Sequence, residues 1–257
     1  MRKGQAGAWR QAGADTEVNI ARARETRPGD VLSGGYASTW VAIPIALESR
    51  FGFGGPMFDR SHVIPANEYR RERWKNSLGW TREIVRVPDD AAWHWRLSIA
   101  EIERDAAFSS FPGIDRELVL LRGNGLRLRF EDGRCVELLP PHERTRFRGE
   151  EGVIGELVDG ITHDFNLMWR RDTVRAELFH RPLVGPMLFF AEPGVTWAIH
   201  LLAGQAEFDV VDDLPALWSG DTALLVSTEG RKRYALHGGG ELLAIRIQTL
   251  TADDISP

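Results

Sequence analysis

Two arginines and a serine give this chain its clearest potential for chemistry. Arg96 and Ser98 alternate onto one face of the segment Trp93–Ile99, and a Pro-Gly corner at 112–113 leads to Arg116. A guanidinium group has a planar fork that binds a carboxylate through two parallel hydrogen bonds. The same stretch contains no evident nucleophile. These residues therefore indicate a receptor for a small carboxylate.

A second alternating segment places Asp164 and Asn166 on one face of another predicted strand. The amide of Asn166 both donates and accepts hydrogen bonds, so it suits an amide, formyl or imidazole group. A buried arginine is expected to need an acidic partner, and Asp164 and Asp115 are the candidates. From residue types alone an alternative stays open, in which these acids and the arginines simply tie neighbouring strands together.

The elements that must position these side chains are short strands. From His62 onward, short segments in which apolar and polar residues alternate are separated by turns containing Gly, Pro and Asp. This pattern occurs in two successive blocks. Asn124-Gly125 and Asp132-Gly133 are hairpin signals, and Gly238-Gly239-Gly240 is interpreted as a turn between two strands. Short helical turns are expected only at 76–78 and 100–107. The pattern predicts an all-β chain with two stacked barrels.

The predicted domain organisation follows from these blocks. We expect an irregular or disordered extension over 1–60, an N-terminal barrel with the ligand pocket over 61–172, a C-terminal barrel over 173–250 and a tail over 251–257. Residues 1–56 alternate poorly and end in a glycine-rich linker. One hypothesis is that Met57 is the natural start of the protein, and the alternative is a natural disordered tail.

Composition limits the classes of function. The 257 residues carry a net charge of −5, which argues against a general nucleic-acid role. Cys135 is the single cysteine, so no intrachain disulfide can form, and a reducing compartment is expected. No apolar run approaches the roughly 20 residues that a membrane helix needs, and no secretory signal is evident. A cytoplasmic protein is therefore expected.

Metal and hydrolytic chemistry find little support in the sequence. The seven histidines are scattered singly, without the His-x-His pair by which one strand offers two imidazoles to a metal. We therefore predict no metal and no cofactor. One alternative stays open, in which His94, His142 and a carboxylate come together in the fold and bind a metal. His237 precedes three glycines, but no Gly-x-Ser-x-Gly elbow accompanies it.

Several segments resemble the HutD/Ves family in their order and spacing, over about residues 62–250. They are Arg73-Trp74-Lys75-Asn76 with Gly79, Thr81-Arg82-Glu83-Ile84, Trp95-Arg96-Leu97-Ser98-Ile99-Ala100, Phe108-Ser109, Phe111-Pro112-Gly113, Asp115-Arg116, and Asp164-Phe165-Asn166-Leu167-Met168 with Arg170. The match is clear in the first block and looser in the second. One departure is Asn76-Ser77-Leu78-Gly79, which replaces a more glycine-rich loop of the family and bears on the identity of the ligand.

The resemblance implies a fold and a role. The fold is a double cupin, two β-barrels in one chain, without the metal-binding histidines of enzymatic cupins. The role is control of bacterial histidine utilisation through binding of a small metabolite, such as urocanate or a formyl- or formimino-glutamate. A second branch of the family carries a stress-response label. The pocket is expected in the first barrel, with Arg116 as the carboxylate binder.

These lines together predict a metal-independent, cytoplasmic bicupin that binds a small anionic metabolite. Arg116 is expected to clamp the carboxylate while Arg96, Ser98 and Asn166 orient the rest of the ligand. Asp164 is expected to hold an arginine in place, and Asn76 with Arg82 to close the rim.

Two alternatives come from other classes of protein. One is a cupin isomerase or hydrolase that uses His94 or Asp164 as a general base, although the sequence favours binding over catalysis. The other is a stress-related interaction protein with a vestigial pocket. No nucleic-acid or membrane partner is expected, and a homodimer is left open.

Overall fold

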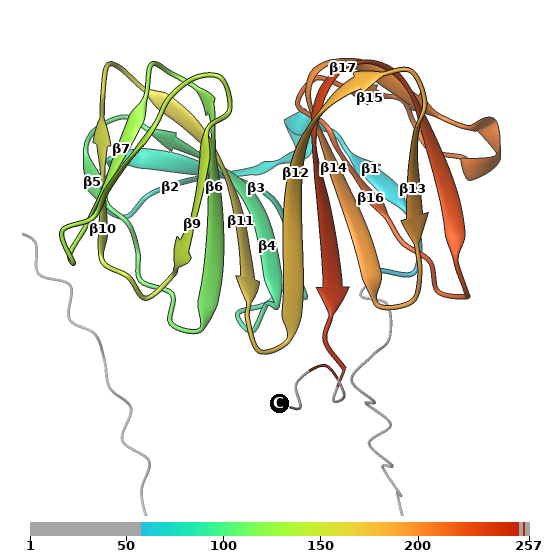
Figure 1. The fold of residues 1–257 in the computed structure, drawn as a ribbon, viewed down its shortest axis with the longest axis horizontal. Helices are drawn as coiled ribbons and strands as arrows, with labels where there is room; N and C mark the ends of the chain where they lie inside the picture. Colours follow the sequence, from blue (N-terminus) through green and yellow to red (C-terminus); the bar gives the residue numbers. More distant parts are fainter. Residues whose placement is uncertain (1–57, 252–253, 255–257) are drawn as a thin grey trace, which may run out of the picture. The chain divides into compact units, whose positions relative to one another are not determined.

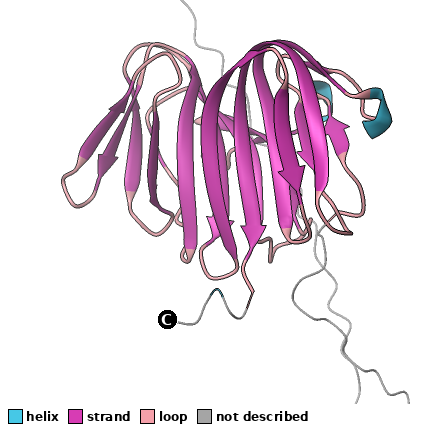
Figure 2. Cartoon of the chain, turned by 45° about the vertical axis from the view of Figure 1, so that its right-hand side comes forward, coloured by secondary structure: helices cyan, strands magenta, loops and turns pink. Residues whose placement is uncertain are grey.

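The computed structural model describes residues 58–251 and residue 254. This part of the chain is nearly all-β, with two short 3-10 helices, η1 (Ala66–Glu68) and η2 (Val210–Asp212) (Figure 2). Neither lies where the sequence predicted helical turns. Residues 100–102 instead complete a strand, in which every residue from Leu97 to Ile102 is buried and which pairs with a neighbouring strand on each side. None of the helices in the described residues has the length and apolar character needed to cross a bilayer.

The first barrel consists of two sheets with a core between them. The six-stranded sheet has the order β2 (Arg70–Arg73), β3 (Gly79–Val87), β4 (Trp95–Ile102), β11 (Thr162–Arg170), β6 (Ile114–Arg122), β9 (Arg144–Arg148). The four-stranded sheet has the order β5 (Ala106–Ala107), β10 (Val153–Leu157), β7 (Leu126–Phe130), β8 (Cys135–Leu138). Leucines of β6 and β7, with Phe130 and Phe147, fill the space between the sheets.

The second barrel is a seven-stranded sheet. Its path is β1 (His62–Ile64), β16 (Thr222–Leu225), β14 (Val195–Phe208), β17 (Lys232–Thr249), β12 (Val174–Val184), with β13 (Met187–Ala191) on β17 and β15 (Leu217–Trp218) on β14. Figure 1 shows these strands beside those of the first barrel. Its interior is a separate apolar cluster that includes Phe189, Leu201, Tyr234 and Leu236.

The glycine run in β17 is not the turn that the sequence predicted. Gly238–Gly240 lies inside one continuous strand and pairs with β14 from Gly204 to Ala206. A Cβ on Gly238 or Gly240 would collide with the backbone of β14, and both residues have positive φ. Glycine is needed here because two bent strands approach closely at a corner of the barrel. The pattern of glycines is the same for a turn and for such a corner.

The two hairpin signals have different outcomes. Asp132-Gly133 joins β7 to β8, which are paired, so that hairpin is confirmed. Asn124-Gly125 joins β6 to β7, which lie in different sheets and do not pair. The hairpin prediction there is wrong, because a turn residue that tolerates positive φ serves a sheet-to-sheet corner equally well.

The first strand lies apart from the block that follows it in sequence. Strand β1 (His62–Ile64) pairs with β16 of the seven-stranded sheet. It therefore belongs to the second barrel, whereas the sequence predicted it in the N-terminal barrel. The Tyr69 hydroxyl also donates a hydrogen bond to the carbonyl of Gly220 at 2.5 Å. The strand is too short for its burial pattern to indicate a partner. The predictions for 1–57 lie outside the described residues, as do those for most of the 251–257 tail.

A third apolar cluster joins the two barrels. It contains Trp95, Leu97 and Ile99 of β4 and Phe165, Leu167 and Trp169 of β11, together with residues of β12, β14, β16 and β17. The central strands of the first barrel are therefore buried on both faces. Their outer face packs on the second barrel, and their inner face lines the interior of the first. The all-β, two-barrel fold predicted from the sequence is confirmed.

Candidate functional site

The polar residues singled out in the sequence meet on the inner face of three neighbouring strands. Strand β11 pairs with β4 on one side and β6 on the other, so Met168 lies opposite both Arg96 and Arg116. One step along the sheet, Asn166 lies opposite Ser98. This register sends the apolar residues of β4 and β11 to the inter-barrel core and turns the polar ones inward.

These residues line a cavity of about 490 Å³ in the first barrel. Its wall also has aromatic and small residues from the segments before β3 and before β6. The lining residues are Glu72, Arg73, Trp74, Lys75, Asn76, Thr81, Arg96, Ser98, Ala100, Ala107, Phe108, Ser109, Phe111, Arg116, Asn166 and Met168. Five of the seven predicted site residues are in this set, and Asp164 and Arg82 are not.

Arg116 is the most unusual group in the cavity. Its residue is only 7% exposed, and its Nη2 donates a hydrogen bond to Oδ1 of Asn166 at 2.8 Å. Its Nε is buried without a hydrogen-bond partner, and no carboxylate in the described residues lies within ion-pair distance of its guanidinium. Burial, with the positive charge of Arg96 nearby, lowers the pKa of Arg116 to about 10. Arg116 is thus a buried cation that has no counter-charge among the described residues.

Aromatic rings surround this guanidinium. Its central carbon lies 5.0 Å from the ring centre of Phe108, 5.9 Å from that of Phe111 and 4.9 Å from that of Phe147. Ring faces stabilise a cation partly, and more strongly in a desolvated site. Residue types gave no signal for this cage, because Phe147 comes from β9 and only the fold places it here. The Phe-Pro-Gly corner supplies Phe111 and, at Gly113, the positive φ that starts β6.

Arg96 differs from Arg116 in having an acidic partner. Its Nε lies 2.7 Å from Oε2 of Glu83, a buried residue of β3 that also lies 3.6 Å from Arg86. From the sequence, Asp164 was a candidate partner for Arg96, and Asp115 was a candidate partner for Arg116. The structure pairs Asp115 with Arg146 and Arg171 instead. Neither predicted pair forms.

Three smaller polar groups face the cavity with hydrogen-bonding capacity to spare. The Ser98 residue is 3% exposed, and its hydroxyl bonds to no described residue. Asn166 uses its oxygen for Arg116, while its amide nitrogen has only a 3.5 Å contact to the carbonyl of Asp164. Asn76 lies at the mouth, where its side-chain oxygen accepts from the amide of Leu78 at 3.1 Å. A ligand can therefore find both donors and acceptors.

Asp164 lies one row deeper, between Ala100 and Leu120. It is completely buried, accepts a 2.7 Å hydrogen bond from the Thr162 hydroxyl, and leaves Oδ1 without a partner. Burial raises the pKa of this carboxyl to about 7, although the Thr162 hydrogen bond opposes the change. The predicted role of holding an arginine does not fit, because no arginine of the described chain contacts Asp164.

Arg82 lies on the other face of the sheet from the cavity. Its Nε is 2.7 Å from Oε1 of Glu101, which also binds Arg71 at 2.6 Å, and its Nη2 is 3.4 Å from Nδ1 of His163. Arg82 therefore belongs to a polar cluster at the edge of the inter-barrel core, where it cannot close the rim. In the pairing of β3 with β4, Arg82 lies opposite Ile99, which belongs to the inter-barrel core.

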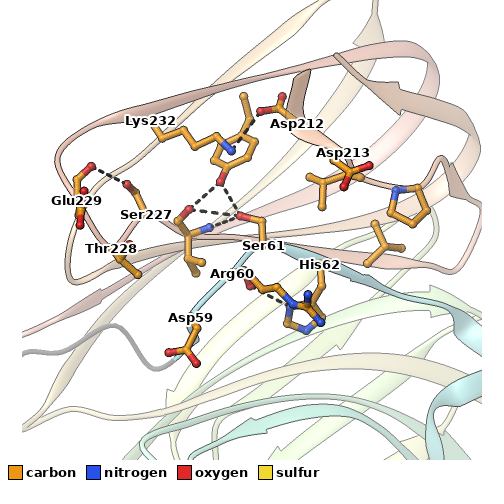
Figure 3. Close-up of a pocket in the computed structure, with 15 residues that line it drawn as sticks. Asp59, Arg60, Ser61, His62, Asp212, Asp213, Ser227, Thr228, Glu229 and Lys232 are labelled. Carbon is orange, nitrogen blue, oxygen red and sulfur yellow. Dashed lines mark hydrogen bonds and ion pairs between the residues drawn. The ribbon is translucent and has the colours of Figure 1, made fainter. Parts of the chain in front are cut away.

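A second cavity, of about 510 Å³, lies beside the start of β1 in the second barrel (Figure 3). Ser61, Tyr234 and the backbone of Val226 bond to one another there, and Lys232 lies 3.4 Å from Asp212. Four carboxylates line it against two cations, Arg60 and Lys232. This excess of acidic groups offers an anion less than the first cavity does.

Comparisons with known proteins show which proteins this chain resembles in sequence. The HutD family model matches residues 66–244. The chain is 39% identical over 118 residues to an uncharacterised 21.2 kDa protein in the hutC 3′ region of Pseudomonas putida, covering 45% of this chain and 62% of that protein. It is 40% identical over 106 residues to the protein Ves of Cronobacter sakazakii, and the match covers 41% of this chain and 58% of Ves. The matched region thus spans about three-fifths of these curated relatives.

Solved structures of similar proteins include a HutD protein. The HutD protein of Pseudomonas fluorescens SBW25, in a formate condition, is 27% identical with a TM-score of 0.65, over 74% of this chain and all of that one. A conserved protein of unknown function from Pseudomonas aeruginosa PAO1 is 25% identical with a TM-score of 0.65, over 75% of this chain and all of that one. The likeness to these two structures shows that the chain shares their fold. Because the family model covers most of the chain, this protein belongs to the HutD family.

Proposed function

We propose that this protein is a receptor for a small carboxylate metabolite of histidine breakdown and acts in control of that pathway. The observation that carries the proposal is Arg116, a buried guanidinium without an acidic partner in the described chain, facing a cavity. A charge buried in this way is costly unless it is paired. A bound carboxylate would supply the missing counter-charge through a bidentate contact.

The rest of the cavity supports a ligand that also has a polar, planar group. Ser98 and the amide of Asn166 offer a donor and acceptors near Arg116, while Trp74, Phe108 and Phe111 supply flat apolar walls. Urocanate, formyl-glutamate and formimino-glutamate each combine a carboxylate with a group of this kind. The name of the Pseudomonas putida relative, which places it beside hutC, supports the link to histidine utilisation.

The lining favours binding over turnover. Glu72 is the only carboxylate among the lining residues, it is exposed at the mouth, and no histidine or cysteine accompanies it. Asp164 and His94, considered as general bases, are not part of the lining. A general base must lie within hydrogen-bond reach of the proton that it removes.

Isothermal titration calorimetry and thermal-shift assays with urocanate, formimino-glutamate, formyl-glutamate, glutamate and formate test the proposal. We expect at least one of these ligands to bind, and Arg116→Met to weaken that binding roughly 10- to 1000-fold, because a charge-assisted bidentate contact is lost. Arg129→Met is the matched control. Arg129 is an exposed arginine of the same barrel, paired with Glu156, so this variant changes the net charge equally without touching the cavity.

Two outcomes would contradict the proposal. The first is equal affinity of the Arg116→Met variant and the wild-type protein for the bound ligand. The second is the absence of a thermal shift with every member of the panel, which would favour an interaction protein with a vestigial pocket. Conversion of a bound ligand into a product, followed by chromatography, would point to the enzyme alternative.

A further inference from the structure

We propose that His142, His180 and Glu241 form a binding site for a divalent transition-metal ion of the zinc class, held between the two barrels. His142 lies in the connection between β8 and β9 of the first barrel. His180 belongs to β12 and Glu241 to β17, both in the second barrel. One ligand atom from each residue lies within 4.8 Å of the other two. None of the three residues lines the carboxylate cavity.

The separations fit a small coordination sphere. Nε2 of His180 lies 3.1 Å from one oxygen of Glu241, and Nε2 of His142 lies 3.5 Å from the other. Zinc binds histidine nitrogen and carboxylate oxygen at about 2.0–2.2 Å, which in a tetrahedron places neighbouring ligand atoms about 3.3 Å apart. The two histidine–glutamate distances are therefore already near the spacing that a bound ion requires, and all three ligand atoms lie within 4.8 Å of one another.

The sheet register brings two of the ligands to one face. In the pairing of β12 with β17, His180 lies opposite Leu243 and Pro182 lies opposite Glu241. His180 and Glu241 are thus diagonal neighbours, two positions apart on the same face, a distance that long side chains span. The third ligand, His142, has a φ of 57°, a left-handed conformation in which histidine, asparagine and aspartate occur more often than other residues with a Cβ.

The hydrogen bonds around the histidines suit metal binding. Nδ1 of His142 lies 3.2 Å from the carbonyl oxygen of Leu120. Because a carbonyl only accepts, Nδ1 carries the proton and Nε2 presents its lone pair toward Glu241. Nε2 of His180 is buried and makes no hydrogen bond of normal geometry with a described group, despite its short distance to the carboxylate. An ion would satisfy both nitrogens.

The ligand set indicates the class of ion. Two imidazoles and one carboxylate suit zinc and neighbouring first-row metals, whereas calcium and magnesium prefer oxygen ligands. Three protein ligands leave a fourth position for water. The side chains of His142, His180 and Glu241 are 15%, 30% and 39% exposed, so the cluster lies near the protein surface. Coordination would tie the first barrel to the second and couple metal binding to stability.

The full chain, stripped with a chelator and dialysed, would be titrated with zinc chloride by calorimetry in a competing buffer. Metal content after dialysis would be counted by mass spectrometry. We expect one zinc ion per chain and a rise in melting temperature that depends on zinc concentration. His180→Ala and Glu241→Gln should each weaken this binding at least 10-fold, and the double variant should abolish it. Losing even a residue that supports a ligand commonly costs 10- to 100-fold.

His237→Ala is the matched control. His237 is an exposed histidine of β17 that lies 2.8 Å from Asp209, so it tests adventitious binding by a His–Asp pair. The control should keep full affinity, as should Arg116→Met in the carboxylate cavity. Glu241→Gln is nearly isosteric, so its metal-free urea midpoint should stay near that of wild type, which separates loss of a ligand from loss of the fold.

Two results would overturn the proposal. One is undiminished zinc binding by the His180→Ala/Glu241→Gln double variant. The other is the absence of zinc retention by wild-type protein, in which case the three side chains form only a hydrogen-bonded histidine–glutamate cluster. A tetrahedral cobalt(II) absorption band that disappears in the double variant would provide independent support.

Discussion

Replacing Arg116 by methionine should leave the ligand-free protein about as stable as wild type. The pKa of Arg116 is lowered to about 10. Each unit by which a pKa is lowered corresponds to 1.36 kcal/mol. Burial, together with the nearby charge of Arg96, therefore penalises the charged form of Arg116 by about 3 kcal/mol. Methionine removes that penalty and keeps contacts with the surrounding rings, since sulfur–aromatic contacts contribute about 0.3–1.5 kcal/mol.

The losses in the variant are of similar size. A hydrogen bond to a charged group contributes about 1.5–3 kcal/mol, and here it is the bond to Asn166. Cation–π contacts contribute about 0.5–2 kcal/mol. These gains and losses nearly cancel, so the free energy of unfolding should change by no more than about 1 kcal/mol. No carboxylate is left unpaired by the substitution, which is why the large cost of breaking a buried ion pair does not arise.

Arg96→Met provides the contrast within the same row of the sheet. Arg96 pairs with the buried Glu83, so its removal leaves a carboxylate whose remaining cation, Arg86, is 3.6 Å away. Breaking a fully buried pair costs about 3–5 kcal/mol, and partial exposure with the second cation reduces this to about 1–3 kcal/mol. Arg96→Met should therefore be the less stable of the two variants.

Urea denaturation followed by tryptophan fluorescence and circular dichroism measures both changes. Comparison of the slopes, or m-values, checks that the unfolded states remain comparable. A loss of about 3 kcal/mol or more in Arg116→Met, equal to or larger than the loss in Arg96→Met, would refute the reasoning. Arg116 would then be a structural cation, and the receptor proposal would lose its main support.

Two further predictions concern the cores. Burial raises the pKa of Asp164 to about 7, so the folded protein keeps a proton that the unfolded chain releases near pH 4, and stability falls as the pH rises from about 4 to 7. The free energy of unfolding of Asp164→Asn should therefore equal that of wild type at pH 4.5 and exceed it by up to a few kcal/mol at pH 8. Urea titrations at the two pH values measure this difference. The same difference at both pH values would show that Asp164 ionises normally. Leu97→Ala removes a fully buried side chain from the inter-barrel core and should cost about 2–5 kcal/mol in the same assay. A cost below about 1 kcal/mol would mean that the two barrels do not depend on this contact.

The sequence predicted the facing of the central strands well. The alternation in β4 and β11 is long and regular, and the side chains it assigned to the apolar face do form the inter-barrel core. Arg96 and Ser98 could be placed on one face of β4 for the same reason, since the period of a strand fixes which of its side chains share a face. Arg116 was expected beside them only because of the resemblance to the HutD/Ves family. Asn76 also lies in the cavity wall, as predicted.

Partners across the fold could not be predicted. Glu83 was not considered for Arg96, and the rings around Arg116 come partly from β9, because such contacts depend on strand order and register. Arg82 was expected at the rim, and only the strand register shows that it lies on the opposite face of the sheet. The glycines of β17 were assigned to a turn, because the local conformational need of a turn and of a barrel corner is the same.

The sequence by itself determined the strand-rich fold, the facing of its regular strands and the residue types that suit a carboxylate. These properties depend on local geometry, and alternation expresses that geometry directly. Only the tertiary structure decided which charges are paired, since it pairs Arg96 with Glu83 and gives Arg116 no acidic partner in the part of the chain that it describes. It also brought His142, His180 and Glu241 together from two barrels. Their separation in sequence carries no periodic signal, because their meeting depends on the packing of one barrel against the other.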